Sequence, residues 1–520
     1  MQYFVKETLL LFVLLNLVAG QSYNSLWPIP QEYAVQPTGD AVKLSSGFAI
    51  VANQPSQILN RAIQRYTSII MQRDFKREYF QACSNSTMSI SKLNVNVASR
   101  DETLDIDTSY EYTVTVEDGE ASITAPTIYG AMYGMETFSQ YSDNGCFNYT
   151  KITIHDYPQY KHRGLMIDTG RRFFPVQLVE NLVDAMSYLK MNVLHLHFSD
   201  FCQFSVQSIQ FPALTSSLEQ YYTQQDVKGL IQYAKDRGIR IMPEIDIPGH
   251  SRGFRPLANL SLVHFCTTNQ RELYNDLNGT TQETLYKLLG EMMDLFPDQY
   301  FHLGCDETTI VGSCTQEGIT SLEGAMLNFT SRQKKTPVGW EEVLFTSKAA
   351  SSQTVVEAWS RHTASQIIAA NHYAIEAAGH HFYLNNKPDF DLCWYDIGPN
   401  FDKEQLEMLL GGEMSMWTDN YCRSHECLDD GKTPPVASWM YDKKYNDVFM
   451  QSVGGMIWPR GIAAAGSFWH YSEDVDSKSP GFLLTMFSQN SRMAKRGVLV
   501  CPSGCACDEV HRCGVPYPHN

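Results

Sequence analysis

The segments GLMID (164–168) and VLHLH (193–197) flank the stretch VQLVENLVDAMSYLK (176–190), and this region decides the fold. Each short apolar segment is typical of a buried strand. Between them, apolar residues recur with the spacing of one helix face, and Pro175 precedes them, as is common at the first turn of a helix. The region therefore predicts a strand–helix–strand unit with parallel strands.

The same alternation continues toward the C-terminus. A helix is predicted to begin near Thr223 and Asp226 and to end at Gly238, and another to span 282–295. No glycine-rich phosphate-binding motif follows the first strand, which disfavours an open dinucleotide-binding sheet. We therefore expect an α/β fold with a (β/α)₈ TIM barrel. Its eight predicted strands span 164–168, 193–197, 239–244, 300–303, 336–340, 354–358, 374–377 and 411–416.

A smaller α+β domain is predicted before the barrel. Residues 112–116 alternate like a half-buried strand, and residues 62–71 have helical spacing. We expect four parts: a signal peptide (1–20), the α+β domain (21–158), the barrel (159–500) and a cysteine-rich tail (501–520).

Composition excludes several classes of protein. Of the 520 residues, 43% are hydrophobic and 19% are charged, which indicates a folded chain. The net charge of −17 disfavours nucleic acid as a partner. Seven of the eight tryptophans lie between positions 340 and 469, which favours a search there for a ring-lined pocket, with core packing as the default use of tryptophan.

The N-terminus predicts export. An apolar run at 9–18 follows Lys6 and is too short to span a bilayer, so we expect a signal peptide and no stable membrane anchor. The 13 cysteines favour disulfides, in the tail as well, because the tail lacks paired C-x-x-C knuckles for zinc. We expect the secretory pathway, with a lysosomal or secreted destination. Glycosylation sequons stand at Asn85, Asn148, Asn259, Asn278 and Asn328.

Polar residues follow the predicted strands, where the active residues of a barrel lie. The adjacent Asp306 and Glu307 are the clearest feature, because two neighbouring carboxylates acquire different pKa values and different roles. The alternative is an ordinary helix start with an acidic first turn. The full set comprises Asp200, Glu244, Asp246, His250, Asp306, Glu307, Trp340, Glu341, Glu342, Trp359, Trp417 and Asp419.

A metal-dependent hydrolase is an alternative hypothesis. His195 and His197 would point to the same side of their strand, as metal ligands can. Only His250 is an obvious further ligand, so we favour a histidine pair packed inside the barrel, with no metal and no cofactor.

Several motifs resemble the β-N-acetylhexosaminidases of glycoside hydrolase family 20. They are HRGLMIDT (162–169), MNVLHLH (191–197), EIDIPGH (244–250), HLGCDET (302–308), VGWEEV (338–343), YLN (383–385), GGEMSMW (411–417) and WPR (458–460). The resemblance covers about residues 23–500. It implies an exo-acting enzyme that removes terminal non-reducing N-acetylhexosamine from glycans with retention, in a substrate-assisted reaction.

The resemblance also implies a role for each matching residue. Glu307 would be the general acid, with a pKa raised by apolar surroundings, and Asp306 would hold the 2-acetamido group of the substrate. Asp200 and His250 would form a relay behind the acid. The substrate-binding residues would be Arg163, Trp340, Trp359, Tyr383, Asn385, Trp417 and Asp419, the last standing where the family has Glu.

The sequence also departs from the family pattern. Cys305 replaces a glycine and is expected to crowd the catalytic loop, and Phe201 stands where a second Asp is common. The span from Cys314 to Trp340 is short, so we expect one trimmed barrel helix. The family disulfide would join Cys266 to Cys314, whereas Ser491 replaces a cysteine that usually closes a C-terminal bridge. The resemblance implies a homodimer, and an inactive sugar-binding protein on the same fold remains the alternative.

Overall fold

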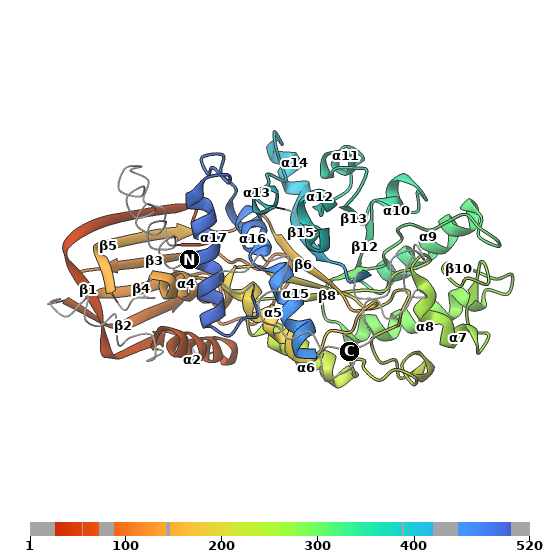
Figure 1. Cartoon of the computed structure of the whole chain (residues 1–520), viewed down its shortest axis with the longest axis horizontal. Helices are drawn as coiled ribbons and strands as arrows, with labels where there is room; N and C mark the ends of the chain where they lie inside the picture. The colour runs from red at the N-terminus through yellow and green to blue at the C-terminus, as the bar shows by residue number, and fades with distance from the viewer. Residues whose placement is uncertain are drawn as a thin grey trace, which may run out of the picture.

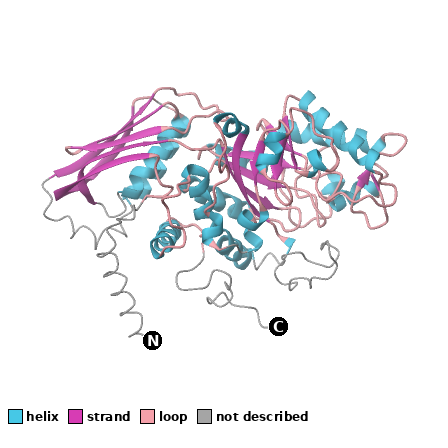
Figure 2. Cartoon of the chain, turned by 90° about the horizontal axis from the view of Figure 1, so that it is seen from above, coloured by secondary structure: helices cyan, strands magenta, loops and turns pink. Residues whose placement is uncertain are grey.

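The computed structural model describes residues 26–54, 56–71, 88–141, 146–386, 389–419 and 446–500. The predicted signal peptide (1–20), the cysteine-rich tail (501–520) and the sequon at Asn85 lie outside this range, as does the side chain of Asn148. The described strands form a sheet at one end of the molecule, a barrel nearer its middle and a short two-stranded sheet (Figures 1 and 2).

The N-terminal group is a five-stranded sheet with two helices on it. Strand β1 pairs with both β2 and β5, so that the order β1-β2-β4-β3-β5 returns to β1. The stretches predicted at 62–71 and 112–116 fall within α2 and β3. The elements are β1 (Glu32–Ala52), α2 (Gln57–Met71), β2 (Met88–Val97), β3 (Tyr112–Glu117), β4 (Glu120–Ala125), α4 (Ile128–Tyr141) and β5 (Cys146–Asp156).

The second group is a closed barrel of eight parallel strands, in the order β11-β12-β13-β14-β15-β6-β7-β8. Every predicted barrel strand is present, and the predicted fold class is confirmed. The strands are β6 (His162–Asp168), β7 (Val193–His197), β8 (Arg240–Glu244), β11 (Tyr300–His302), β12 (Thr336–Trp340), β13 (Val355–Ala358), β14 (Ala374–Glu376) and β15 (Leu409–Met416).

Helices between the strands form the outer layer of the barrel. The predicted start of α6 is confirmed, because Thr223 and Asp226 form a capping box. The helix after Cys314, α9, has 17 residues, and its trimming relative to the family stays a prediction. The elements are α5 (Val176–Tyr188), η3 (Pro212–Leu214), α6 (Gln224–Lys235), η4 (Ser251–Phe254), α7 (Arg255–Ala258), β9 (His264–Phe265), β10 (Leu273–Tyr274), α8 (Thr280–Leu295), α9 (Gln316–Arg332), α10 (Glu342–Phe345), α11 (Ala364–Ala369), α12 (Gly379–Phe382), η5 (Leu384–Asn386), α13 (Phe390–Cys393) and α14 (Lys403–Met408).

Three C-terminal helices, α15 (Asn446–Ile457), α16 (Arg460–His470) and α17 (Pro480–Lys495), pack where the two groups of strands meet (Figure 1). Trp469 of α16 belongs to the core of the N-terminal sheet and contacts Tyr133 edge to face, with ring centroids 5.6 Å apart. Trp458 is also fully buried. Core packing therefore accounts for part of the late tryptophan enrichment. None of the described helices has the length and apolar composition needed to cross a membrane.

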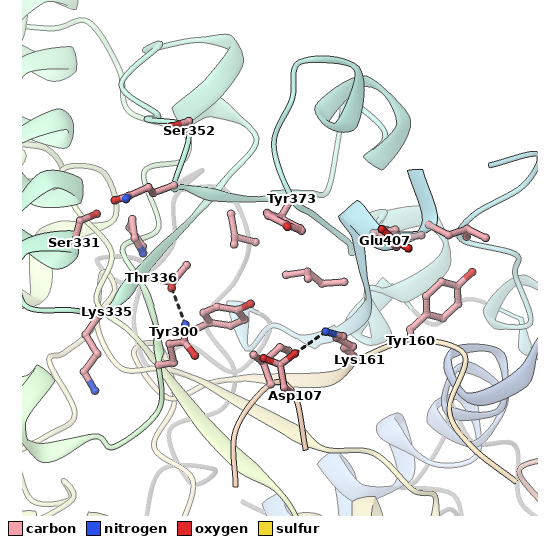
Figure 3. Close-up of a pocket in the computed structure, with 18 of the residues that line it drawn as sticks. Asp107, Tyr160, Lys161, Tyr300, Ser331, Lys335, Thr336, Ser352, Tyr373 and Glu407 are labelled. Carbon is pink, nitrogen blue, oxygen red and sulfur yellow. Dashed lines mark hydrogen bonds and ion pairs between the residues drawn. The ribbon is translucent and has the colours of Figure 1, made fainter. Parts of the chain in front are cut away.

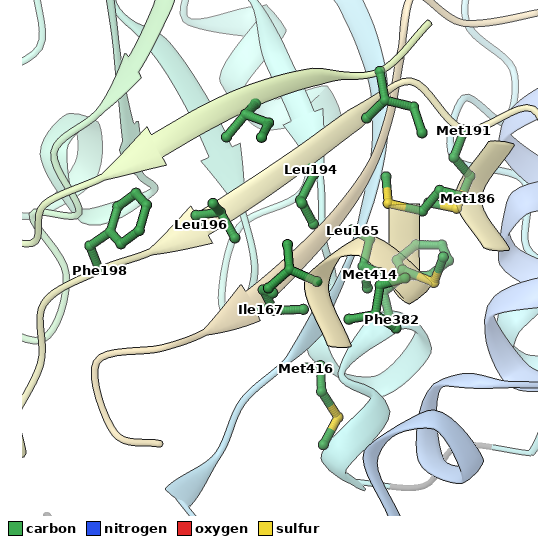
Figure 4. Close-up of a cluster of buried hydrophobic side chains, with 14 of the residues drawn as sticks. Leu165, Ile167, Met186, Met191, Leu194, Leu196, Phe198, Phe382, Met414 and Met416 are labelled. Atoms are coloured by element: carbon green, nitrogen blue, oxygen red, sulfur yellow. The ribbon is translucent and has the colours of Figure 1, made fainter. Parts of the chain in front are cut away.

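Along β7, side chains alternate between the outer core and the interior of the barrel. Leu194 and Leu196 belong to the large core between strands and helices, together with apolar side chains of β6 and β15 (Figure 4). Successive strand residues face opposite sides. His195 and His197 therefore point into the barrel, where both are fully buried.

Candidate active site

The candidate site lies at the carboxyl ends of the barrel strands, and the loop after β11 carries its two central carboxylates. This loop has an unusual backbone, with φ of 66° at Gly304, 71° at Cys305 and 47° at Glu307. A Cβ at Gly304 would approach Oδ1 of Asp246 to 1.9 Å, so only glycine fits there. Cys305 adopts the left-handed conformation with a side chain, at a cost of roughly 1–2 kcal/mol. Its thiol is buried and points toward the carbonyl of Leu303.

A chain of polar contacts runs from the surface into the barrel behind Glu307. Oε2 of Glu307 lies 3.3 Å from Nε2 of His250, and Nδ1 of His250 lies 3.4 Å from Oδ1 of Asp200. His250 is 7% exposed, whereas 47% of the Glu307 side chain is exposed. The three residues thus come together in the order that the relay requires.

The electrostatics of Glu307 differ from the expectation. The hydrogen bond with His250 lowers the pKa of Glu307, and this effect exceeds that of burial. The expected rise by an apolar surround is therefore wrong for the substrate-free protein, because the side chain is half exposed and faces an imidazole.

Asp306 has the opposite environment. It is 8% exposed, and burial raises its pKa. The pKa of the neighbouring Asp246 is also raised, by burial and by the charge of Asp306. Among the described residues, Oδ1 of Asp306 has no hydrogen-bond partner. The loop therefore carries one enclosed carboxyl with a free oxygen beside one solvent-facing carboxylate.

Four aromatic side chains from different strand ends form a continuous wall. Trp359 stacks on Tyr383 with ring centroids 6.0 Å apart and an interplanar angle of 5°. Tyr383 and Trp340 each lie 6.0 Å from Trp417. Asn385 is half-buried, and its Oδ1 has no partner among the described residues. The predicted aromatic residues do come together. Burial raises the pKa of Tyr383, and the charge of Asp306 adds to this rise.

The expectation for Arg163 needs correction. Arg163 is the second residue of β6, at the amino-terminal end of the strand and thus at the floor of the barrel. Its guanidinium is fully buried and donates to the carbonyls of Lys190 and Tyr160 at 2.8 and 2.6 Å. It also lies over the rings of Tyr110 and Trp469. Arg163 joins the two domains and does not reach the mouth.

Arg171, which sequence reasoning missed, lies at the mouth of the barrel, where Arg163 was expected. It follows the carboxyl end of β6 and contacts Asp168 and Asp200 at 3.1 and 2.9 Å. Its Nε lies 3.2 Å from Oδ1 of Asp419, and its guanidinium lies over the Trp417 ring. The rule that active residues follow strand ends points to Arg171.

A cluster of imidazoles and carboxylates fills the barrel below the mouth. His195 and His197 pair with Glu244, and His195 also pairs with Glu413 at 2.7 Å. Groups of three such residues have ligand atoms within 4.8 Å of one another, His195, Glu244 and His302 among them. They could hold a metal ion by distance alone. All three are fully buried, and the ring nitrogens of the two histidines already face carboxylates.

A cavity lies at each end of the barrel. One of about 480 Å³ opens beside Glu307 and is lined by Trp359, Glu342 and Glu323 among others. A larger one of about 1060 Å³ lies at the opposite end of the barrel, around Tyr300, Thr336 and Tyr373 (Figure 3). It contains none of the predicted site residues.

The structure also bears on the predicted disulfide and on the glycosylation sequons. The predicted disulfide between Cys266 and Cys314 is present, with Cα atoms 5.2 Å apart. The asparagines of the three described sequons, Asn259, Asn278 and Asn328, are exposed. Exposure is compatible with glycosylation, which stays a prediction.

The comparison with protein families decides the assignment. Residues 160–430 match the family model described as "Glycosyl hydrolase family 20, catalytic domain". The chain belongs to glycosyl hydrolase family 20. Residues 26–141 match a second model, described as "beta-acetyl hexosaminidase like". The protein is thus a glycosidase of the β-N-acetylhexosaminidase family, whose members act on terminal N-acetylhexosamines.

Relatives of this family 20 chain match along most of their length. The β-hexosaminidase subunit beta of Sus scrofa is 29% identical and covers 95% of each chain. The human subunit beta is 28% identical over 93% of this chain and 90% of its own. Solved structures share the fold. The chitobiase of Flavobacterium johnsoniae has a TM-score of 0.72 and 23% identity over 91% of this chain and 73% of its own. The N-acetyl-β-hexosaminidase of Streptomyces plicatus has a TM-score of 0.67 and 18% identity, over 92% and 97%.

Proposed function

We propose that the protein is an exo-β-N-acetylhexosaminidase that hydrolyses terminal non-reducing N-acetylglucosamine or N-acetylgalactosamine from glycans. The reaction would be retaining and substrate-assisted, through an oxazolinium intermediate. The observation that carries this proposal is the pair of carboxyls after β11. Asp306 is enclosed beside the aromatic wall, with one oxygen that has no hydrogen-bond partner in the part of the chain that the structure describes, whereas Glu307 faces solvent.

Asp306 would act on the acetamido group. Its carboxylate would accept the acetamido N–H, and the acetamido carbonyl oxygen would then attack the anomeric carbon. The adjacent negative charge stabilises the cation that forms. Tyr383 would donate a hydrogen bond to the same carbonyl oxygen, and its raised pKa keeps the phenol protonated as a donor.

Glu307 would transfer the proton. It would protonate the leaving glycosidic oxygen and then remove a proton from the water that opens the oxazolinium ring. Because its pKa is lowered in the free protein, a bound sugar that displaces water around the half-exposed side chain would have to raise it. His250 and Asp200 would orient this carboxyl.

The sugar would lie between the aromatic wall and Arg171. Trp340, Trp359 and Trp417 would enclose the acetamido group and one sugar face, with Asn385 near its hydroxyls. Arg171 and Asp419, which already form an ion pair, would bind hydroxyls at the far side of the ring.

The direct test is hydrolysis of a chromogenic N-acetyl-β-glucosaminide by the purified protein. Turnover supports the enzyme, and saturable binding of N-acetylglucosamine without turnover supports the alternative, an inactive sugar-binding protein. We propose no metal requirement. Complete inhibition by EDTA that zinc reverses would contradict this and favour a metal-dependent hydrolase.

We also propose passage through the secretory pathway to a lysosomal or extracellular destination, the domain boundaries given above, and a homodimer. The apolar run at 9–18 supports export, whereas the dimer rests on the family resemblance alone. N-terminal sequencing that recovers Met1 on the native protein would contradict the first. A monomeric mass by light scattering would contradict the dimer.

A further inference from the structure

We propose that Glu244 is a positioning residue that anchors both halves of the proposed site, the relay to the acid and the tryptophan wall. This inference rests on the proposed function. Glu244 ends β8 and is fully buried. Four ring nitrogens surround its two oxygens. Oε2 lies 2.5 Å from Nδ1 of His197 and 3.1 Å from Nε2 of His195, and Oε1 lies 3.0 Å from Nε1 of Trp340 and 3.2 Å from Nδ1 of His302.

The first arm leads from Glu244 to the acid. Nε2 of His197 lies 2.9 Å from Oδ2 of Asp200, so one imidazole bridges two carboxylates. A neutral imidazole has one N–H, and only the imidazolium donates from both nitrogens. The pKa values of Glu244 and Asp200 are both lowered, and that of His197 is raised well above its usual value. Glu244 therefore keeps His197 a double donor, and Asp200 in turn fixes His250 beside Glu307.

The second arm leads from Glu244 to the wall. The indole N–H of Trp340 donates to Oε1 of Glu244 at 3.0 Å. Trp340 is 1% exposed and contacts Trp417, which itself lies edge to face with His197 at 5.1 Å. A buried indole N–H usually finds one acceptor, and this bond orients the Trp340 ring. Both sets of contacts thus begin at the carboxylate of Glu244.

Other charged groups surround Glu244, and a test must distinguish their effects from those of Glu244. Around Glu244 and His197 lie the imidazoles of His195 and His302 and the carboxyls of Asp168, Asp200, Asp246, Glu357 and Glu413. Glu413 provides a matched control. It is fully buried inside the same barrel and pairs with His195 and His162 at 2.7 and 2.8 Å. The described contacts of Glu413 include neither His197 nor Trp340.

The experiment compares Glu244→Gln with Glu413→Gln. Both changes remove one buried negative charge and keep the side-chain shape. For Glu244→Gln we expect kcat/KM on a chromogenic N-acetyl-β-glucosaminide to fall about 100-fold, because small displacements in a site have effects of that order. We also expect a new loss of activity with rising pH near neutrality, where His197 would now lose its proton. Glu413→Gln should keep the wild-type pH profile. The same profile in both variants would overturn the inference.

A second measurement needs neither Glu244→Gln nor enzymatic activity. In wild-type protein labelled with ¹⁵N-histidine, His197 should give imidazolium signals at pH 7, assigned by their loss in His197→Gln. A neutral His197 at pH 7 would overturn the inference even if Glu244→Gln does not fold. Absence of wild-type turnover would contradict the proposed function, whereas the imidazolium signal would still report on Glu244.

Discussion

Nε2 of His250 lies 3.3 Å from Oε2 of Glu307, and this contact lowers the pKa of the proposed acid. In the substrate-free protein Glu307 is therefore an anion at neutral pH. Donation of a proton requires that substrate binding remove water from the half-exposed side chain and raise its pKa. The rate should then depend on how strongly the leaving group requires protonation.

Replacement of Glu307 by Gln tests this dependence. The amide cannot donate an acidic proton, so kcat should fall most for a natural disaccharide, whose alcohol leaves poorly. Substrates with an activated phenol should lose much less. Rates on both substrate types, measured for wild type and variant, give the ratio. Equal losses on both would exclude an acid role for Glu307.

Asp306→Asn should impair formation of the oxazolinium ion. The variant keeps the shape of the side chain but loses the charge that orients the acetamido group and stabilises the cation. We expect kcat to fall by about 10²- to 10³-fold, as when one preorganised electrostatic partner is lost. An activated substrate should not rescue it, in contrast to Glu307→Gln. Steady-state kinetics on the substrate with the activated phenol leaving group provide the check. Rates near wild type would refute the role assigned to Asp306.

The two arginines make a matched pair. Arg171→Lys removes the fork that spans Asp200 and Asp419, so KM should rise and kcat/KM should fall at least about tenfold. Arg163→Lys should lower the unfolding temperature, since a buried bidentate donor is lost, yet leave the kinetic constants of the remaining folded enzyme unchanged. The reverse pattern would restore Arg163 to the site.

Buried charges in the barrel predict how stability varies with pH. The pKa values of His195 and His197 are raised, so these residues stabilise the folded state fully below about pH 6.5. This contribution to the free energy of unfolding is lost as pH rises. The pKa of Glu413 is lowered to about 2, so its contribution is present above about pH 4.5 and is lost as pH falls. Burial raises the pKa of Glu342 to about 8, which also lowers stability as pH rises from about 4.5 to 8. The midpoint of thermal unfolding should therefore be higher at pH 5 than at pH 8. A higher midpoint at pH 8 would contradict these pairings.

Strand positions could be predicted because they depend on local pattern. The apolar segments at 164–168 and 193–197 became β6 and β7, and capping by Thr223 placed α6. The rule that functional residues follow barrel strands also placed Asp306, Glu307 and the tryptophans. These features depend on sequence periodicity and on the geometry of parallel strands.

Features that depend on distant contacts could not be predicted. Motif matching favoured Arg163, although its place five residues before the end of β6 puts it at the barrel floor, and strand-end reasoning would have favoured Arg171. The lowered pKa of Glu307 depends on His250, 57 positions earlier in the chain, and on the exposure of its own side chain. The two carboxylates that pair with His195, Glu244 and Glu413, come from β8 and β15, which the sequence does not pair with it.

The most direct test of substrate assistance is a comparison of two sugars on the same protein. A chromogenic N-acetyl-β-glucosaminide and the matching plain β-glucoside differ only in the 2-acetamido group, which we propose to be the nucleophile. We expect rapid hydrolysis of the first and almost none of the second, at concentrations where both bind. Comparable turnover of the plain glucoside, with a sugar adduct on a carboxylate detected by mass spectrometry, would show that the enzyme supplies its own nucleophile and contradict the account.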